Sequence, residues 1–150
     1  MTTLLERLDS DLKDAMRARN QVRLDTIRQV KSTVTNEEIK TGKPANDAAV
    51  EDIIARLVRQ HRESIEMFTK GGRSELAQQE QAQLETLLSY LPQQLGPAEL
   101  RALVQQLARE LGIGSPADKG KLMGKLMPQV KGKAEGKLVN EIVNDVLGSP

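Results

Sequence analysis

The octapeptide YLPQQLGP, residues 90–97, decides how the rest of the chain is interpreted. It holds two prolines and one glycine within eight residues. Proline lacks the backbone donor that a helix needs and clashes with the preceding turn, so no helix is expected to continue through this stretch. The sequence on either side shows helical periodicity. We therefore predict two parts, an N-terminal domain over residues 1–92 and a C-terminal domain over residues 96–150.

Four helices are expected before this boundary, because apolar residues recur at three- and four-residue spacing without a convincing strand pattern. A capping box at Thr3 begins the first helix, whose apolar stripe includes Met16 and which Asn20 is expected to end. Ser74 is expected to cap the fourth helix. The four cover about residues 3–20, 22–41, 46–70 and 74–91.

Three helices are expected after the boundary. Pro97 suits a first helical turn and Gly112 a helix end, while Pro128 is expected to terminate the middle helix of the three. The sequence therefore predicts an all-α fold, with a four-helix N-terminal bundle and a three-helix C-terminal tail. The helices of the tail cover about residues 97–112, 115–128 and 134–148.

Composition excludes several classes of function. The 150 residues carry a net charge of +1 and no cysteine, which excludes disulfides, thiol nucleophiles and cysteine-based metal sites. The only aromatic rings are Phe68 and Tyr90, so no platform exists for stacking nucleobases. The charged, leucine-rich N-terminus lacks the apolar run of a signal peptide, and no segment nears the roughly 18 apolar residues of a membrane span. We expect a cytoplasmic protein with no membrane partner, cofactor or metal.

The stretch GKLMGKLMPQVKGKAEGKLV, residues 120–139, combines lysine with glycine, which is a poor helix former. From residue 119 to residue 137, six lysines stand against a single acid, Glu135. A polyanion would respond to this local excess even though the whole chain is nearly neutral. The lysines are Lys119, Lys121, Lys125, Lys131, Lys133 and Lys137.

A helical wheel sorts these residues onto faces. Lys121 and Lys125 lie opposite the apolar side chains, with Gly120 and Gly124 at the border. The next helix is expected to carry a polar column on one side. If the two helices are neighbours, the polar surfaces merge into a ledge of bare backbone edged by lysines, which suits a phosphate backbone. The column comprises Lys133, Lys137, Asn140 and Asn144, and Gly136 also allows close approach.

A plainer interpretation of this stretch stays open. The glycines would then permit close helix packing or the turn around Pro128, and the lysines would only solvate a helix face. Gly112, Gly114 and Gly132, near helix ends, fit this interpretation best. For Gly120 and Gly124 the two interpretations are evenly matched.

Other candidate residues have ordinary explanations. His61 sits among apolar residues at helical spacing and is expected to be a satisfied residue at the surface or the edge of the core. Arg23, Arg28 and Lys31 are expected to be surface charges. No acid–base pair, nucleophile elbow or phosphate-binding loop is evident, so catalysis by this chain alone is not expected.

Three segments together resemble one known family. Residues 122–143, LMGKLMPQVKGKAEGKLVNEIV, closely resemble the C-terminal signature of the GatB/YqeY family. Residues 23–40, RLDTIRQVKSTVTNEEIK, and residues 90–95, YLPQQL, are similar to the N-terminal half of YqeY-like proteins. Lys133 stands where arginine is frequent, and Glu135 where aspartate is frequent. Lysine keeps the charge but loses the bidentate phosphate contact that arginine makes.

The resemblance implies a role on tRNA. The tail is similar to the tail domain of the B subunit of glutamyl/aspartyl-tRNA amidotransferase, which implies tRNA contact without the amidation chemistry. The expected function is a tRNA-binding accessory protein, with aminoacyl-tRNA synthetases or amidotransferase subunits as further partners. One alternative is a protein-interaction module that docks a partner helix. Another is a non-catalytic component of a carbon–nitrogen ligase complex that uses glutamine as amide donor.

Overall fold

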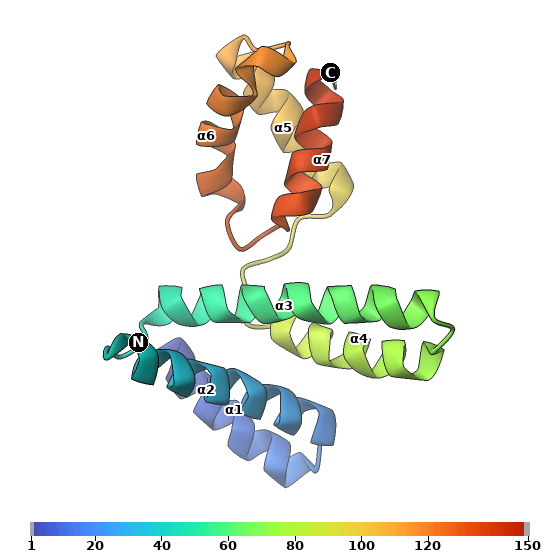
Figure 1. The fold of residues 1–150 in the computed structure, drawn as a ribbon. Helices are drawn as coiled ribbons and strands as arrows, with labels where there is room; N and C mark the ends of the chain where they lie inside the picture. The colour runs from blue at the N-terminus through green and yellow to red at the C-terminus, as the bar shows by residue number, and fades with distance from the viewer. Residues whose placement is uncertain (1, 149–150) are drawn as a thin grey trace. The chain divides into compact units, whose positions relative to one another are not determined.

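The computed structural model describes residues 2–148, which form seven α-helices and a short 3-10 turn and contain no strand (Figure 1). The all-α class predicted from the sequence is confirmed. The chain divides into two compact units, Met1–Pro92 and Gln93–Pro150. The elements in chain order are α1 (Leu4–Ala18), α2 (Gln21–Thr41), α3 (Asp47–Lys70), α4 (Ser74–Leu88), α5 (Pro97–Leu111), η1 (Pro116–Asp118), α6 (Lys119–Val130) and α7 (Gly136–Leu147).

The first unit consists of two helical hairpins, α1 with α2 and α3 with α4 (Figure 1). Helix α2 packs against both helices of the second hairpin. Its core is aliphatic, and Leu8, Ile27, Ile54 and Leu87 are fully buried. Burying each such side chain stabilises the fold by about 1.5 to 3 kcal/mol relative to exposure. Packing of the apolar stripes, rather than helix propensity alone, therefore holds these helices in place.

Side-chain caps set where the first two helices begin. The Thr3 hydroxyl accepts a hydrogen bond from the backbone N–H of Glu6 at 3.1 Å, as the capping box predicts. Asn20 differs from expectation, since α1 ends at Ala18. The Asn20 side chain instead accepts from the backbone N–H of Arg23 at 3.1 Å and caps α2. Its extended backbone points the amide oxygen into the first turn of α2, where free N–H groups lie.

Two further expectations for the first unit are wrong. Ser74 is the first residue of α4, whose cap position is occupied by Arg73 without a side-chain hydrogen bond. Met16 is 54% exposed rather than part of the apolar stripe. The buried stripe of α1 runs through Leu8 and Ala15, and a turn of about 100° per residue carries the next side chain away from the core.

The second unit has a core of its own, formed by α5, α6 and α7. Helix α5 packs against both α6 and α7. Leu100, Val104, Leu122, Leu126 and Val139 are fully buried there. None of these side chains belongs to the apolar cluster of the first unit. Each unit therefore buries its own aliphatic residues.

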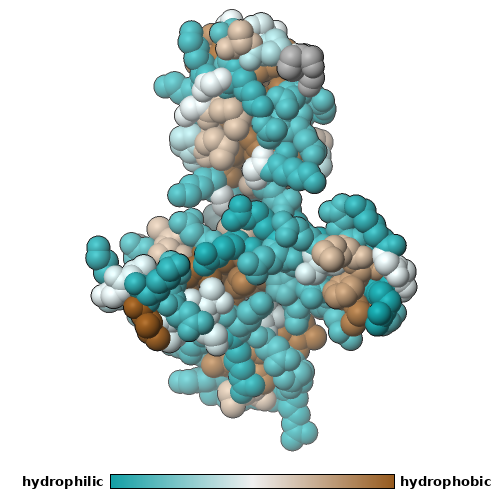
Figure 2. Space-filling model, viewed as in Figure 1, coloured by the Kyte–Doolittle hydropathy of each residue, from teal (hydrophilic) through white to brown (hydrophobic). Residues whose placement is uncertain are grey.

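The face of the molecule seen in Figure 2 is mainly hydrophilic. Figure 2 shows that polar residues predominate on the face in view of both units, with the more apolar residues in small separate patches. Within residues 2–148, no helix is both long and apolar enough to cross a membrane.

Candidate nucleic-acid interface

The two glycines of α6 face solvent. A Cβ atom built on Gly120 or Gly124 would meet no heavy atom within 4 Å outside the helix's own backbone, and the same holds at Gly136 near the start of α7. Close packing against another helix of this chain therefore does not explain these glycines. That part of the plainer interpretation is wrong for Gly120 and Gly124.

Helix α6 turns its glycines outward because its apolar side chains turn inward. Leu122, Leu126 and Val130 are fully buried at four-residue spacing. The opposite face then presents Gly120, Gly124 and Lys121, all exposed. The glycines thus lie on the solvent-facing side of α6, not merely at the border of its apolar face.

Pro128 does not end α6 as predicted. The helix continues to Val130, with Pro128 inside its last two turns. Proline has no N–H to donate to the carbonyl of Gly124 four residues earlier, so this helix loses one internal bond. The burial of Leu126 and Val130 on either side of the proline holds the last turn in helical geometry.

A groove of about 440 Å³, called the glycine groove below, runs along this outward face. Two exposed lysines and two glycines of α6 form one side of it, and the last residue of α5, Leu111, completes it together with Ile113. Sequence reasoning missed these apolar residues, which follow one another around Gly112. The signal available was that glycine, whose left-handed φ of 66° turns the chain at the end of α5. The groove is lined by Leu111, Ile113, Gly120, Lys121, Gly124 and Lys125.

Lys119 lies apart from this groove. Its ammonium group donates to the side-chain oxygen of Asn140 on α7 at 2.5 Å. This contact joins α6 to α7, so the two helices are neighbours, as the merged ledge requires. It also occupies Asn140, one of the residues predicted to contact nucleic acid.

The polar column predicted on α7 is shorter than expected. Helix α7 begins at Gly136, with Glu135 as an extended cap residue, so Lys133 lies outside the helix. The column on α7 therefore begins at Lys137. Glycine at the first helical position and an extended residue before it shorten the helix that periodicity alone predicts.

The loop between α6 and α7 is anchored within its own unit. The backbone N–H of Leu95 donates to the carbonyl of Lys133 at 2.8 Å, and the side-chain amide of Gln94 donates to the carbonyl of Gly132 at 2.7 Å. Gly132 has a φ of 77°, which favours glycine. Lys131, Lys133 and Lys137 are exposed but do not line the glycine groove.

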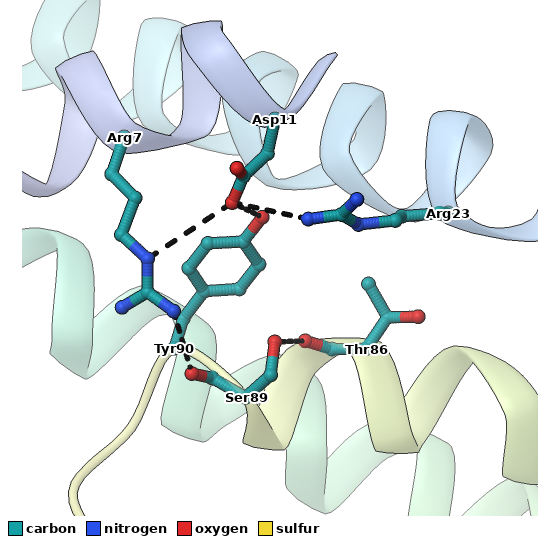
Figure 3. Close-up of polar contacts among 6 residues, drawn as sticks. All are labelled: Arg7, Asp11, Arg23, Thr86, Ser89 and Tyr90. Atoms are coloured by element: carbon teal, nitrogen blue, oxygen red, sulfur yellow. Dashed lines mark hydrogen bonds and ion pairs between the residues drawn. The ribbon is translucent and has the colours of Figure 1, made fainter. Parts of the chain in front are cut away.

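Tyr90 of the YLPQQL segment is bound to the first unit. Figure 3 shows its ring between α1 and the end of α4, with the hydroxyl pointing at Asp11. The hydroxyl donates to Asp11 Oδ2 at 2.5 Å, and Arg23 pairs with the same oxygen at 3.3 Å. Arg7 lies over the ring, 4.7 Å from its centre, and donates to the carbonyl of Ser89 at 3.0 Å.

The surroundings of Tyr90 keep its hydroxyl protonated. Burial disfavours the charged phenolate, and the hydrogen bond to the Asp11 carboxylate adds to this, raising the pKa of Tyr90 to about 12. Tyr90 therefore serves as a neutral donor that ties α4 to α1. The geometry gives it a structural role rather than the role of a general acid or base.

The remaining polar candidates are also structural. His61 is buried, and its two ring nitrogens contact Glu80 and Gln29, as expected of a satisfied residue at the core edge. Arg23 pairs with Asp11 and Lys31 pairs with Asp9 inside the first unit. Among residues 2–148, no group of three histidine or acidic side chains could hold a metal ion.

The comparisons with known proteins assign this helical architecture to one family. A family model described as Yqey-like protein matches residues 5–147, so both units fall within it. The chain belongs to the YqeY-like family, as the three sequence segments predict.

Curated relatives carry a different kind of name. The chain is 37% identical over 113 residues to "Altered inheritance of mitochondria protein 41, mitochondrial" of Lachancea thermotolerans, covering 73% of this chain and 60% of that protein. The protein of the same name from Eremothecium gossypii is 41% identical over 91 residues, covering 60% and 50%. The one from Pyrenophora tritici-repentis is 36% identical over 124 residues, covering 81% and 67%. This chain thus spans about half to two thirds of their lengths.

The predicted cytoplasmic location is wrong by this comparison, because the relatives are named as mitochondrial proteins. The error arises because the search for an apolar run detects only secretory signal peptides and membrane spans. Lack of a long apolar segment argues against a secretory signal peptide, whereas mitochondrial targeting segments are amphipathic and rich in arginine. That absence could not distinguish the cytoplasm from a mitochondrion.

Proposed function

We propose that the C-terminal unit binds tRNA through its sugar–phosphate backbone, as an accessory module near aminoacylation or tRNA-dependent amidation. The observation that carries the proposal is the exposure of Gly120 and Gly124 beside Lys121 and Lys125 in one groove. Residues 122–143 resemble the tail of the amidotransferase B subunit, and this resemblance also favours tRNA as the ligand.

Exposed glycines inside a helix call for an explanation outside the chain. Each one costs about 1 kcal/mol relative to alanine, and among residues 2–148 a Cβ at Gly120 or Gly124 would meet no heavy atom within 4 Å outside its own helix backbone. Without side chains at these positions, a sugar–phosphate strand can approach the helix backbone. Lys121 and Lys125 then act as point charges on either side of the contact. Recognition would rest on shape and phosphate, because neither of the two aromatic rings, Phe68 and Tyr90, lines this groove.

The other predicted residues would contribute around this centre. Lys131, Lys133 and Lys137 are exposed and have room to meet more distant phosphates. Gly136 is open at the start of α7. Lys119 and Asn140 are bound to each other, so we propose that they orient the two helices and contact the ligand as a pair.

A second candidate function is docking of a partner helix. Leu111 is 38% exposed and lines the groove with Ile113, which gives the groove an apolar wall that a phosphate strand does not need. Aminoacyl-tRNA synthetases and amidotransferase subunits would be candidate partners. A non-catalytic place in a carbon–nitrogen ligase complex fits either function but rests on kinship alone.

Salt dependence tests the proposal. The Lys121→Ala/Lys125→Ala variant should bind total tRNA more weakly, and the slope of log K against log salt should flatten by about 0.7 to 0.9 for each lost contact. The matched control is Lys40→Ala/Lys43→Ala, which removes two exposed lysines from the first unit. Equal tRNA affinities of the two variants, or a loss of tRNA affinity that leaves the salt slope unchanged, would reject phosphate contact by Lys121 and Lys125. Salt-independent binding to a protein partner, with no tRNA binding at low salt, would favour the partner helix.

A further inference from the structure

A second groove adjoins the glycine groove on the C-terminal unit. It measures about 520 Å³ and lies between α5 and α7. Ile113 lines both grooves, so they meet at this residue. Arg101, Arg109 and Asp145 are the charged residues of the second groove. A ligand that follows the glycine groove past Ile113 therefore enters a site with two arginines.

The arginines stand in a row on α5. Arg101 and Arg109 are eight residues apart with Gln105 midway, which spaces them along about 12 Å of one helix face. All three are exposed. This row is long enough to accept an extended ligand rather than a single small anion.

The two arginines differ in their present partners. Arg101 pairs with Asp145 at 3.1 Å, which orients its guanidinium and offsets part of its charge. Arg109 makes no side-chain hydrogen bond or ion pair to any residue from 2 to 148. Its five donors are therefore available to a ligand. Arg109 is the residue expected to contribute most, with Arg101 held in position beside it by Asp145.

The charge pattern selects an extended polyanion. Lys121 and Lys125 line the glycine groove and Arg101 and Arg109 line the second one. The two grooves together thus present four cations against one acid, Asp145. A guanidinium binds a phosphate with two parallel hydrogen bonds, a geometry that lysine cannot provide. A sugar–phosphate chain supplies anions at regular intervals along such a path.

We propose that the second groove is a further contact site for the same RNA backbone, and that Arg109 binds a phosphate there through two hydrogen bonds. This inference rests on the proposed function of the glycine groove. It extends the interface from α6 onto α5 and assigns a role to arginines outside the glycine–lysine stretch.

The test compares tRNA binding by the Arg109→Ala, Arg109→Lys and Arg56→Ala variants of the full chain, using fluorescence anisotropy from about 50 to 200 mM salt. Arg56 is an exposed arginine of α3 and serves as the control. Arg109→Ala should weaken binding about three- to tenfold and lower the salt slope by about 0.7 to 0.9. Arg109→Lys should restore the slope and only part of the affinity, while Arg56→Ala should leave both unchanged. The melting temperature of each variant should match that of the parent chain.

The possible failures are distinguishable. If Lys121→Ala/Lys125→Ala weakens binding but Arg109→Ala does not, the second groove is not part of the interface and the proposed function stands. If neither variant differs from its control, both proposals fail. A loss of tRNA affinity in Arg109→Ala without a change of salt slope would also overturn the phosphate contact by Arg109.

Discussion

The hydroxyl of Tyr90 donates a hydrogen bond to Oδ2 of Asp11, 79 residues earlier in the chain, at 2.5 Å. This contact fixes the last residues before Pro92 to α1 of the first unit. On the other side of the proline, Gln94 and Leu95 are hydrogen-bonded to the loop after α6. The segment YLPQQL therefore anchors to a different unit at each of its ends.

Removing the Tyr90 hydroxyl should destabilise the first unit. Tyr90→Phe loses one hydrogen bond to a charged acceptor, and we expect the free energy of unfolding to fall by about 1.5 to 3 kcal/mol. Urea denaturation measures the change. Ser89→Ala removes only an exposed hydroxyl that bonds to the carbonyl of Thr86, so it should lie within about 0.5 kcal/mol of the parent. Equal effects of the two substitutions would contradict the role given to Tyr90.

The raised pKa of Tyr90 has a consequence for stability at high pH. The folded chain holds the proton up to a pKa of about 12, whereas the unfolded chain loses it near 10. The contribution is therefore fully present below about pH 10 and is lost as the pH rises from there through 12. Because this is the only tyrosine, its ultraviolet absorbance reports the titration directly. A midpoint near 10 in the folded protein would show that the hydroxyl is not held as described.

Arg19 offers a stabilising substitution. It has a φ of 54°, the only non-glycine residue with positive φ among residues 2–148. Glycine adopts this left-handed conformation without the cost that a Cβ imposes. Arg19→Gly should therefore raise the free energy of unfolding by about 1 kcal/mol, as seen in the melting temperature. Arg19→Ala keeps the Cβ and should give no comparable gain, so an equal gain in both would point to the loss of charge instead.

Each core should respond separately to a cavity. Leu126→Ala should lower the free energy of unfolding of the C-terminal unit by about 2 to 5 kcal/mol, because Leu126 is fully buried there. Leu8→Ala should lower the free energy of unfolding of the first unit by a similar amount. Amide hydrogen exchange, followed residue by residue, reports which unit opens. Faster exchange in both units after either substitution would contradict two separate cores.

The sequence predicted the helices better than their ends. Periodicity predicts the buried face of α6, since Leu122 and Leu126 are buried as the wheel indicates, although it places the exposed Met16 in the apolar stripe of α1. The end of α6, at Val130, lies two residues beyond the predicted end because buried residues hold a helix through Pro128, an effect of packing that a local rule omits. Periodicity predicts a start of α7 that is too early, because the pattern cannot show that Glu135 is extended.

The candidate site was only partly predictable. The glycines and lysines of α6 stand out by composition, whereas Leu111, Ile113 and Arg109 reach the grooves through the packing of α5 on α6 and α7. Gly112 is a local signal for Leu111 and Ile113 on either side of it, whereas nothing local marks Arg109. Their contribution depends on which helices are neighbours, and this information lies in contacts that are distant in the sequence.

The most direct test of the central claim is the paired measurement of stability and tRNA affinity in the Gly120→Ala/Gly124→Ala variant. A Cβ at either position meets open space, so helix propensity should raise stability by up to about 1 kcal/mol per site. The added methyl groups should at the same time obstruct the backbone ledge and weaken tRNA binding. A more stable protein with weaker tRNA binding is the predicted result. Undiminished tRNA affinity in the stabilised variant would contradict the claim that the exposed glycines of α6 serve a nucleic-acid ligand.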